Sequence, residues 1–268
     1  MTPTQNGESA GERWRRMVEA LAVPTAIAGD AEDKPVLLEP ERFRWKPDVD
    51  AAQPVRPSRR RALEALPEGG SVLDVGVGGG ASSLGLVPKA ALIVGVDHNE
   101  GMLELFRESA EQAGVEARTV QGLWPEVADE VAPVDVAVCH HVMYRARHPE
   151  GFAMALTAKA RARVVVELSA EPPLAALNPL WKSIHGVERP EWPVADAAEQ
   201  VLAAMGLAVE REDTVLPPRA PEVTPEMVAF ARSRLYASPE HDAEIEAYLR
   251  NREPQEQRVV ALWWPGGA

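Results

Sequence analysis

The stretch that most constrains the fold is the run from Val72 to Gly80, which reads VLDVGVGGG. A short β-branched strand ends at an acid, and the chain then enters a turn with glycines at 76, 78 and 80. Glycine adopts positive φ without strain, and it lacks the Cβ atom that would hold a ligand away from the backbone. Small residues follow that can open a helix. The run therefore predicts a strand, a tight loop and a helix N-terminus that together receive a ligand.

Apolar runs of the buried-strand type recur along the chain, separated by segments with helical spacing. We expect strands at 71–75, 91–96, 116–120, 134–139, 162–168, 207–215 and 257–264. We expect helices at 12–21, 58–66, 81–87, 100–114, 149–160, 194–205, 224–235 and 239–250. This alternation predicts an α/β fold with a seven-stranded, mostly parallel sheet that helices cover on both faces.

Two segments fall outside the strand–helix alternation. Residues 1–57 are charged, dotted with prolines and poor in apolar residues, so we expect a small N-terminal helical cap with a disordered start at 1–11. Residues 58–268 would form the main domain. Within it, residues 170–193 are rich in proline and tryptophan, and we interpret them as a lid or substrate segment.

Composition excludes several classes of partner. The net charge of -13 argues against a broad nucleic-acid-binding face, and the one tight basic run, 59–61, is expected to be a solvated surface. The single cysteine, Cys139, cannot form an intramolecular disulfide. The polar N-terminus does not look like a secretory signal, and no apolar window is long enough for a membrane span. We expect a cytoplasmic protein without a membrane partner, and nothing indicates its oligomeric state.

Two cofactors are compatible with the glycine-rich turn. The dinucleotide pattern G-x-G-x-x-G/A is met by Gly76, Gly78 and Ala81. The methyl-donor pattern D-x-G-x-G-x-G is met by Asp74, Gly76, Gly78 and Gly80. A carboxylate is unfavourable beside a pyrophosphate, whereas it suits the ammonium and sulfonium of S-adenosylmethionine. Asp74 therefore favours the methyl donor, and a nicotinamide-dependent oxidoreductase remains the alternative.

From about residue 58 to residue 268 the chain resembles the class I S-adenosylmethionine-dependent methyltransferases. The resemblance implies a Rossmann-like, doubly wound sheet with an antiparallel last strand, and S-adenosylmethionine as the cofactor. It implies that Asp97, with His98 beside it, binds the ribose, and that Met102 packs against the adenine. The acid that usually follows the third strand is replaced by Leu123, so the Leu123 backbone or Trp124 would contact the adenine. Core packing is the alternative for Met102 and Trp124.

The acceptor side of the site is expected where the fourth strand ends, at the sequence CHHVMY over residues 139–144. Ligands bind at the carboxyl ends of strands in open parallel sheets. His140 would lie near the methionine end of the cofactor. His141 and Tyr144 would reach the acceptor, with histidine able to take a proton near neutral pH. The alternative is that both histidines only cap the strand through hydrogen bonds.

A second group of aromatic residues lies in the segment 170–193. Trp181 and His185, together with Trp192, are expected to form an aromatic wall that binds the acceptor. The alternative is a lid that packs on the N-terminal cap through Trp14 and Trp45. No histidine or carboxylate spacing indicates a metal site.

The favoured function is therefore an S-adenosylmethionine-dependent methyltransferase that acts on an unidentified small-molecule acceptor. A non-catalytic S-adenosylmethionine-binding scaffold and the nicotinamide-dependent oxidoreductase are the alternatives.

Overall fold

The computed structural model describes residues 7–28, 40–218, 223–254 and 256–268. Within these residues one sheet contains seven strands in the order β3-β2-β1-β4-β5-β7-β6. The strands are β1 Gly70–Val75, β2 Ala90–Asp97, β3 Glu116–Gln121, β4 Val134–His140, β5 Ala160–Ser169, β6 Glu210–Leu216 and β7 Gln257–Pro265. β7 runs antiparallel to both neighbours, while the pairs from β3 to β5 are parallel. The expected fold class is confirmed.

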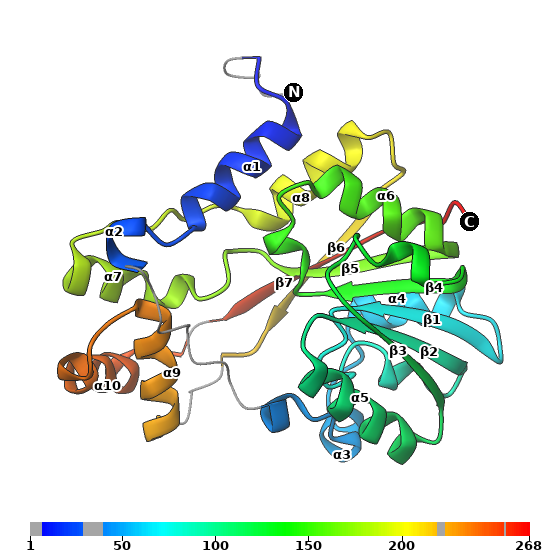
Figure 1. Cartoon of the computed structure of the whole chain (residues 1–268), viewed down its shortest axis with the longest axis horizontal. Helices are drawn as coiled ribbons and strands as arrows, with labels where there is room; N and C mark the ends of the chain where they lie inside the picture. Colours follow the sequence, from blue (N-terminus) through cyan, green and yellow to red (C-terminus); the bar gives the residue numbers. More distant parts are fainter. Residues whose placement is uncertain (1–6, 29–39, 219–222, 255) are drawn as a thin grey trace.

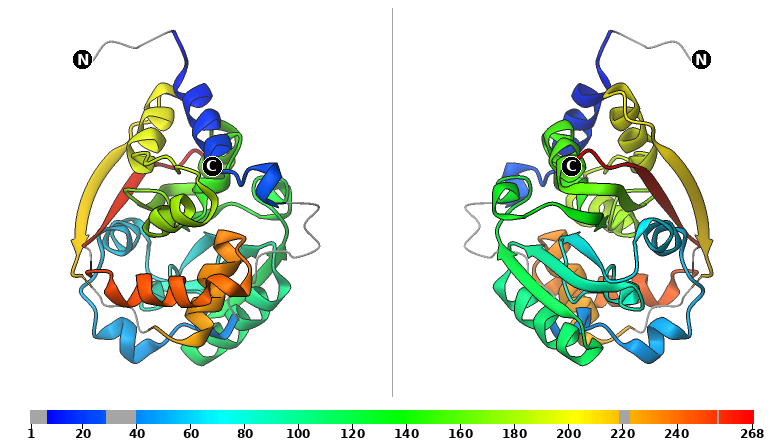
Figure 2. Two further views of the ribbon diagram at one scale, coloured as in Figure 1. Left: turned by 90° about the vertical axis from the view of Figure 1, so that its left-hand side faces the viewer. Right: turned by 90° about the vertical axis from the view of Figure 1, so that its right-hand side faces the viewer.

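Helices cover both faces of this sheet (Figure 1, Figure 2). The α-helices of the described residues are α1 Ala10–Leu21, α2 Thr25–Ala28, α3 Pro47–Ala51, α4 Pro57–Ala65, α5 Glu100–Ala113, α6 Pro149–Lys159, α7 Asn178–His185, α8 Val194–Ala204, α9 Pro225–Leu235 and α10 Asp242–Asn251. α1, α6 and α8 bury their apolar residues against one face, and α4 and α5 against the other. The strands alternate accordingly: Leu73 and Val75 face the first group, and Val72 faces the second.

The helix expected at 81–87 is wrong. The segment consists of turns and a single 3₁₀ turn, η2 (Leu84–Leu86). The Ser82 and Ser83 hydroxyls donate hydrogen bonds to the Asp74 carboxylate, at 3.0 and 2.6 Å for the shorter contacts. Serine side chains that bond locally in this way compete with helical backbone bonding. Pro88 follows and stops any extension.

α1 starts earlier than expected and is part of the core. Ser9 caps it in a capping box with Glu12, so the order begins within the expected disordered start, whose residues 1–6 lie outside the described residues. The Trp14 and Met17 side chains are fully buried against the sheet face that α6 and α8 also cover. The Trp14 Nε1–H donates to the carbonyl of Ala146 at 2.6 Å. This helix is anchored directly on the sheet.

α7, α9 and α10 form a third apolar cluster, gathered together at one end of the sheet (Figure 1). Leu180, Leu235 and Ile245 are at its centre. The chain enters this cluster after β5 and β6 and leaves it before β7. Because β7 is antiparallel to β5 and β6, all three connections lie at the same edge of the sheet. Within the described ranges, no helix is both long and apolar enough to cross a membrane.

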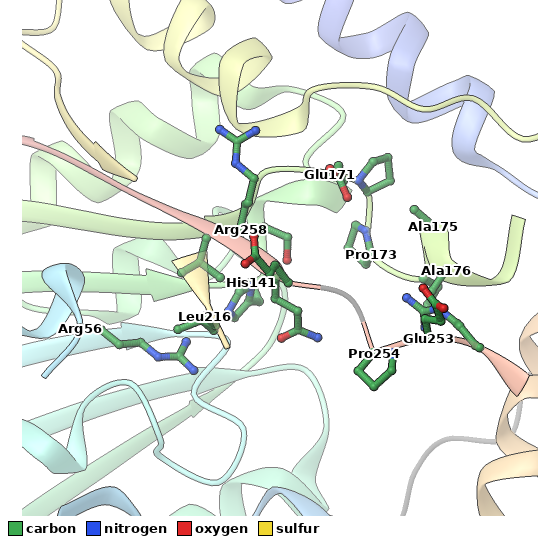
Figure 3. A pocket seen from close by; sticks show the side chains of 17 residues that line it. Arg56, His141, Glu171, Pro173, Ala175, Ala176, Leu216, Glu253, Pro254 and Arg258 are labelled. Atoms are coloured by element: carbon green, nitrogen blue, oxygen red, sulfur yellow. The ribbon is translucent and has the colours of Figure 1, made fainter. Parts of the chain in front are cut away.

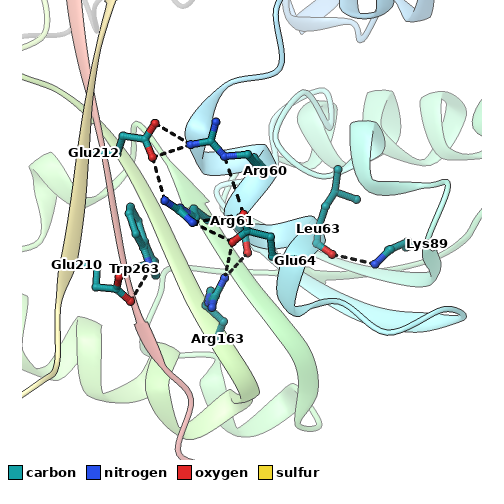
Figure 4. Close-up of polar contacts among 9 residues, drawn as sticks. All are labelled: Arg60, Arg61, Leu63, Glu64, Lys89, Arg163, Glu210, Glu212 and Trp263. Carbon is teal, nitrogen blue, oxygen red and sulfur yellow. Dashed lines mark hydrogen bonds and ion pairs between the residues drawn. The ribbon is translucent and has the colours of Figure 1, made fainter.

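The basic run at 59–61 is ion-paired (Figure 4). Arg60 and Arg61 of α4 both contact the Glu212 carboxylate on β6, at 2.6 and 3.2 Å. The Arg61 guanidinium also lies 4.4 Å from the centroid of the Trp263 ring. Single surface pairs contribute little, but a network of this kind, with a cation–π contact, holds α4 against the last two strands. Arg60 and Arg61 therefore have a structural role at the surface, where they hold α4 in place.

Candidate cofactor and acceptor site

The glycine loop has the backbone that its sequence predicts. Gly76, Gly78 and Gly80 have φ values of 74°, 50° and 88°. A Cβ on Gly78 would have no heavy atom within 4 Å, so this position borders open space. A Cβ on Gly76 would lie 2.1 Å from Cγ2 of Val142. The loop therefore touches the segment that follows β4, which brings the predicted cofactor and acceptor residues to one edge of the sheet.

Asp74 is fully buried, and its described contacts are internal to the loop. Both carboxylate oxygens accept hydrogen bonds from Ser82 or Ser83. Burial raises the pKa of Asp74 to about 6, with nearby Asp97 acting in the same direction and the serine hydrogen bonds opposing it. The carboxylate thus fastens the glycine loop to the following turn. A direct contact with the methionine end of the cofactor stays a prediction.

Asp97 lies at the rim of the loop, at the end of β2. Its carboxylate accepts from the Gly78 and Asn99 amides at 3.1 and 3.0 Å, and the His98 Nδ1 is 3.3 Å away. An ionised carboxylate offers about four acceptor directions, so these contacts leave room for donors from a ligand. The fixed carboxylate beside an open glycine is a suitable place for a vicinal diol.

Three residues are predicted to contact the adenine: Met102, Leu123 and Trp124. Met102 is half-buried near the start of α5, which is compatible both with an adenine contact and with core packing. Trp124 packs in the core and donates its Nε1–H to the Phe152 carbonyl at 3.3 Å. The position of Trp124 therefore agrees with the alternative prediction, which was core packing. The Leu123 side chain is 55% exposed and is the apolar group that this loop presents outward.

The sequence did not reveal a strap, residues 40–46, that lies over the glycine loop. A Cβ on Gly79 would be 1.9 Å from the Phe43 carbonyl oxygen, so the two backbones are in direct contact. Arg44 bonds to Glu41 within the strap and to Glu108 on α5. The strap contains no periodic apolar pattern, only Phe43 and Trp45 as a sign that it packs. Its position follows from long-range contacts.

These features fit S-adenosylmethionine. Gly78 borders open space at the loop, and Asp97 offers acceptor capacity beside it. At the end of β4, the His140 Nε2 is buried and has no hydrogen-bond partner among the described residues. Burial lowers the pKa of His140 to about 4, so the ring is uncharged at neutral pH. An uncharged ring is compatible with a sulfonium nearby, whereas an imidazolium would repel it.

The structure brings His141 and Tyr144 together. His141 Nδ1 lies 3.1 Å from the Tyr144 hydroxyl oxygen, which also accepts a hydrogen bond from the Ser169 amide. His141 has a φ of 59°, a left-handed conformation that is uncommon for histidine. Such strain persists where the surroundings enforce it, and it is often found at functional sites.

Glu167 completes this group, and sequence reasoning missed it. It is 1% exposed near the end of β5, beside His140 in the sheet register. Oε1 contacts Arg56 Nη1 at 2.6 Å and His141 Nε2 at 3.2 Å, and Oε2 accepts from the Ser58 hydroxyl at 2.6 Å. Burial alone would raise the pKa of Glu167, but His141, His140, Arg56 and Ser58 hold it well below its usual range. The only signal was one acid inside the apolar run of a buried strand.

A cavity of about 340 Å³ opens beside His141 (Figure 3). Arg56 and His141 lie on one side of it, and Glu253 and Pro254 on the other. Its walls come from the end of β5, the following segment 171–176, and residues 252–254 and 256–259, which lie before and at the start of β7. Both acidic and basic side chains line it. The cavity can hold a polar small molecule.

Trp181, His185 and Trp192 do not form the single wall that we expected. Trp181 and His185 pack together in the cluster of α7, α9 and α10, with ring centroids 5.1 Å apart. The His185 Nε2 contacts the Leu235 carbonyl at 2.6 Å. Trp192 packs instead on the sheet face that α1 covers. Neither Trp181 nor His185 lines the cavity.

The alternative role for the segment 170–193, packing on the N-terminal cap, is partly met. Trp192 packs against the cluster that contains Trp14, and the Arg16 guanidinium lies 5.5 Å from the Trp192 ring centroid. Arg189 Nη1 donates to the Ala22 carbonyl at 2.8 Å. Trp14 belongs to the cluster on the first sheet face, Trp45 packs on the second, and Trp181 lies in the third cluster. Trp45, on the second sheet face, lies apart from the cluster that contains Trp14 and takes no part in that cluster. Over the part of the chain that the structure describes, no three histidine, cysteine or carboxylate side chains are grouped to hold a metal ion.

Comparisons with known proteins agree with this geometry. Residues 72–163 match the family profile described as "Methyltransferase domain". No curated protein matches the chain. Among solved structures, the YcgJ protein from Bacillus subtilis is 17% identical with a TM-score of 0.51, covering 78% of this chain and 96% of its own.

Two further structures are similar in fold. A protein of Bacillus halodurans C-125, described as a proposed methyltransferase, is 15% identical with a TM-score of 0.51, covering 79% of this chain and 97% of its own. The magnesium protoporphyrin IX methyltransferase of Synechocystis PCC 6803 was solved with S-adenosylhomocysteine. It is 15% identical with a TM-score of 0.47, covering 91% of this chain and 92% of its own. At these identities the two structures with a TM-score of 0.51 indicate the fold alone, and the profile match concerns residues 72–163. Residues 72–163 therefore match a methyltransferase domain, which agrees with S-adenosylmethionine as the cofactor.

Proposed function

We propose that this protein transfers a methyl group from S-adenosylmethionine to a small molecule that binds in the cavity beside His141. The observation that carries the proposal is the position of His141, which lines the cavity while the segment just after it touches the glycine loop through Val142 and Gly76. When bound, the cofactor supplies an activated methyl group on a cationic sulfur. The protein's task is then mainly to orient the acceptor and to exclude water.

Each group of residues has a distinct part in the proposal. Gly76, Gly78 and Gly80, with Asp74 behind them, form the cradle for the methionine end. Asp97 and His98 hold the ribose, and Leu123 and Met102 border the adenine. His140 is the uncharged neighbour of the sulfur, and His141 with Tyr144 accepts a proton from the acceptor.

The charges that line the cavity favour a small polar acceptor over a nucleic acid. Its lining includes Arg56, Arg252 and Arg258 together with Glu171, Glu253 and Glu256, so it has no excess of positive charge. The net charge of -13 disfavours a polyanionic partner in the same way. We also propose a cytoplasmic location, because the single cysteine cannot form an intramolecular disulfide.

Isothermal titration calorimetry with three ligands tests the cofactor. S-adenosylmethionine and S-adenosylhomocysteine should both bind, and NADH should not. Binding of NADH alone would support the nicotinamide-dependent alternative. Binding of both sulfur ligands without methyl transfer to any member of a panel of hydroxyl and amine compounds, followed with radiolabelled cofactor, would favour the non-catalytic scaffold.

A further inference from the structure

We propose that Glu167 is a positioning residue that fixes His141 as the proton acceptor, and that the acceptor therefore carries a proton on its reacting atom. The inference rests on the proposed methyl transfer and deepens it by naming a substrate class. The acceptor would be a hydroxyl compound or a neutral primary or secondary amine. A thioether or a tertiary amine has no such proton to release.

The direction of the hydrogen bonds assigns the tautomer of His141. The Tyr144 oxygen accepts from the Ser169 amide, so its single proton is available for His141 Nδ1 at 3.1 Å. Ionised Glu167 can only accept, so we assign the ring hydrogen of neutral His141 to Nε2, which lies 3.2 Å from Glu167 Oε1, and this leaves Nδ1 unprotonated. Burial raises the pKa of Tyr144, which keeps this phenol protonated. The neutral ring therefore presents Nδ1 as its basic atom.

Glu167 can stabilise the ring after it takes up a proton. The carboxylate is held in place from both sides, by Arg56 Nη1 at 2.6 Å and by the Ser58 hydroxyl at 2.6 Å. A buried carboxylate next to an imidazole favours the protonated ring, because the opposite charge is close and poorly screened. Arg56 and Ser58 keep Glu167 itself ionised, so that it does not take the proton.

Several charged or titratable groups surround His141 and can influence its protonation. On its own segment they are His140 and Tyr144, and from other elements they are Glu167 and Arg56. The remaining walls of the cavity contribute Glu171, Arg252, Glu253, Glu256 and Arg258. Of these, Glu167 is the carboxylate with a contact to the His141 ring. It is therefore the group expected to control the ring.

The balanced step explains the substrate class. The acceptor atom forms a bond to the methyl carbon, the carbon–sulfur bond breaks, and its electron pair stays on sulfur. The proton of the acceptor atom ends on Nδ1 of His141, while the Tyr144 hydroxyl keeps its own hydrogen, turns it away, and accepts from the new Nδ1–H. The new positive charge on the ring then lies against Glu167. Release of the proton to water completes the cycle.

The test uses chemical labelling, which needs no acceptor. Diethyl pyrocarbonate acylates unprotonated imidazole, and peptide mass spectrometry reports the rate at each histidine as a function of pH. In Glu167→Gln, the pH at which His141 reaches half of its maximal rate should fall by about one unit. His98 and His148 in the same sample should not change. Glu171→Gln removes a carboxylate from the same cavity and serves as the matched control.

An unchanged His141 profile in Glu167→Gln, or an equal shift in Glu171→Gln, overturns the proposal. A second measurement does not depend on either variant. Nitrogen-15 NMR of histidine-labelled protein with S-adenosylhomocysteine should show His141 with a proton on Nε2 and none on Nδ1 at high pH, and the reverse assignment also overturns it. If S-adenosylhomocysteine fails to bind in calorimetry, the proposed function fails, while the labelling result still decides the role of Glu167.

Discussion

At the scale of single residues, two buried carboxylates at strand ends behave in opposite ways. Asp74 has only serine hydroxyls as donors, and burial raises its pKa to about 6. Glu167 has an arginine, a histidine and a serine, and its pKa lies well below the usual range. Desolvation opposes ionisation in both, and a nearby cation reverses the outcome only for Glu167. One carboxylate is therefore pH-sensitive near neutrality, and the other stays ionised.

Asp74→Asn should make unfolding less dependent on pH. The folded-state pKa of about 6 is above the unfolded value of about 3.9, so the stabilising effect of protonation is full below about pH 4 and is lost as pH rises through 6. Relative to the variant, the wild type should lose up to about 3 kcal/mol between pH 4 and pH 7.5. Urea unfolding at both pH values measures this difference. Equal pH dependence in the two proteins would contradict the assignment.

Asp97→Asn should weaken cofactor binding by about tenfold to a hundredfold, as expected when one charged hydrogen-bonding group is lost. Calorimetry with S-adenosylhomocysteine measures the change. Asp135→Asn is the matched control, because Asp135 lies at the opposite end of the sheet, where it bonds to Ser71. The control should alter stability and leave the affinity unchanged. Equal affinity in wild type and Asp97→Asn would rule out the ribose role.

At the scale of elements, the strap 40–46 and the glycine loop act as one unit. The strap crosses from α5, where Pro40 lies close to Gly101, to the loop, where Phe43 meets Gly79. Arg44 ties it to Glu108 at 2.8 Å. Phe43 remains 44% exposed beside this contact. Because the backbones touch, the strap position and the loop geometry depend on each other.

Gly79→Ala should displace the strap and loosen the cofactor site. The added Cβ would lie 1.9 Å from a backbone oxygen, which no side-chain rearrangement can relieve. We expect faster hydrogen exchange at 43–45 and an affinity for S-adenosylhomocysteine reduced by at least tenfold, about 1.4 kcal/mol.

Gly151→Ala on α6 is the control, since its Cβ would meet no heavy atom within 4 Å. It should stabilise the helix by about 0.5 to 1 kcal/mol and leave binding unchanged. Unchanged exchange at 43–45 in Gly79→Ala would mean that the contact does not hold the strap.

At the scale of the whole molecule, α1 packs directly on the sheet, so we expect the two to unfold together. Trp14→Ala should lower the free energy of unfolding by about 3 to 5 kcal/mol, because it removes a fully buried indole and its bond to the Ala146 carbonyl. Thermal unfolding followed by near-UV circular dichroism measures the loss. A separate early transition that leaves the main transition unchanged would show that α1 belongs to an independent cap. The division of the chain at residue 57 stays a prediction until then.

Local chemistry made much of the fold predictable. The apolar strands and the glycine turn at 76–80 are determined by neighbouring residues, so the sheet and its loop could be inferred from their spacing. The helix at 81–87 was wrong because its serines bond to Asp74, which is a contact between elements. The prediction of an aromatic wall was wrong for the same reason, because contacts between elements decide where these side chains pack. Trp181 and Trp192 are near in sequence but pack in different clusters.

The sequence by itself determined the fold class, the glycine loop, and the acid at the end of β2, because strand and turn preferences act over a few residues. Only the tertiary structure placed Glu167 against His141 and the strap against Gly79, because these contacts join residues far apart in the chain. The glycine loop can thus be predicted from its residue types and their spacing. The proposed proton acceptor, His141, contacts a carboxylate that is paired with Arg56, and no local sequence pattern indicates that pairing.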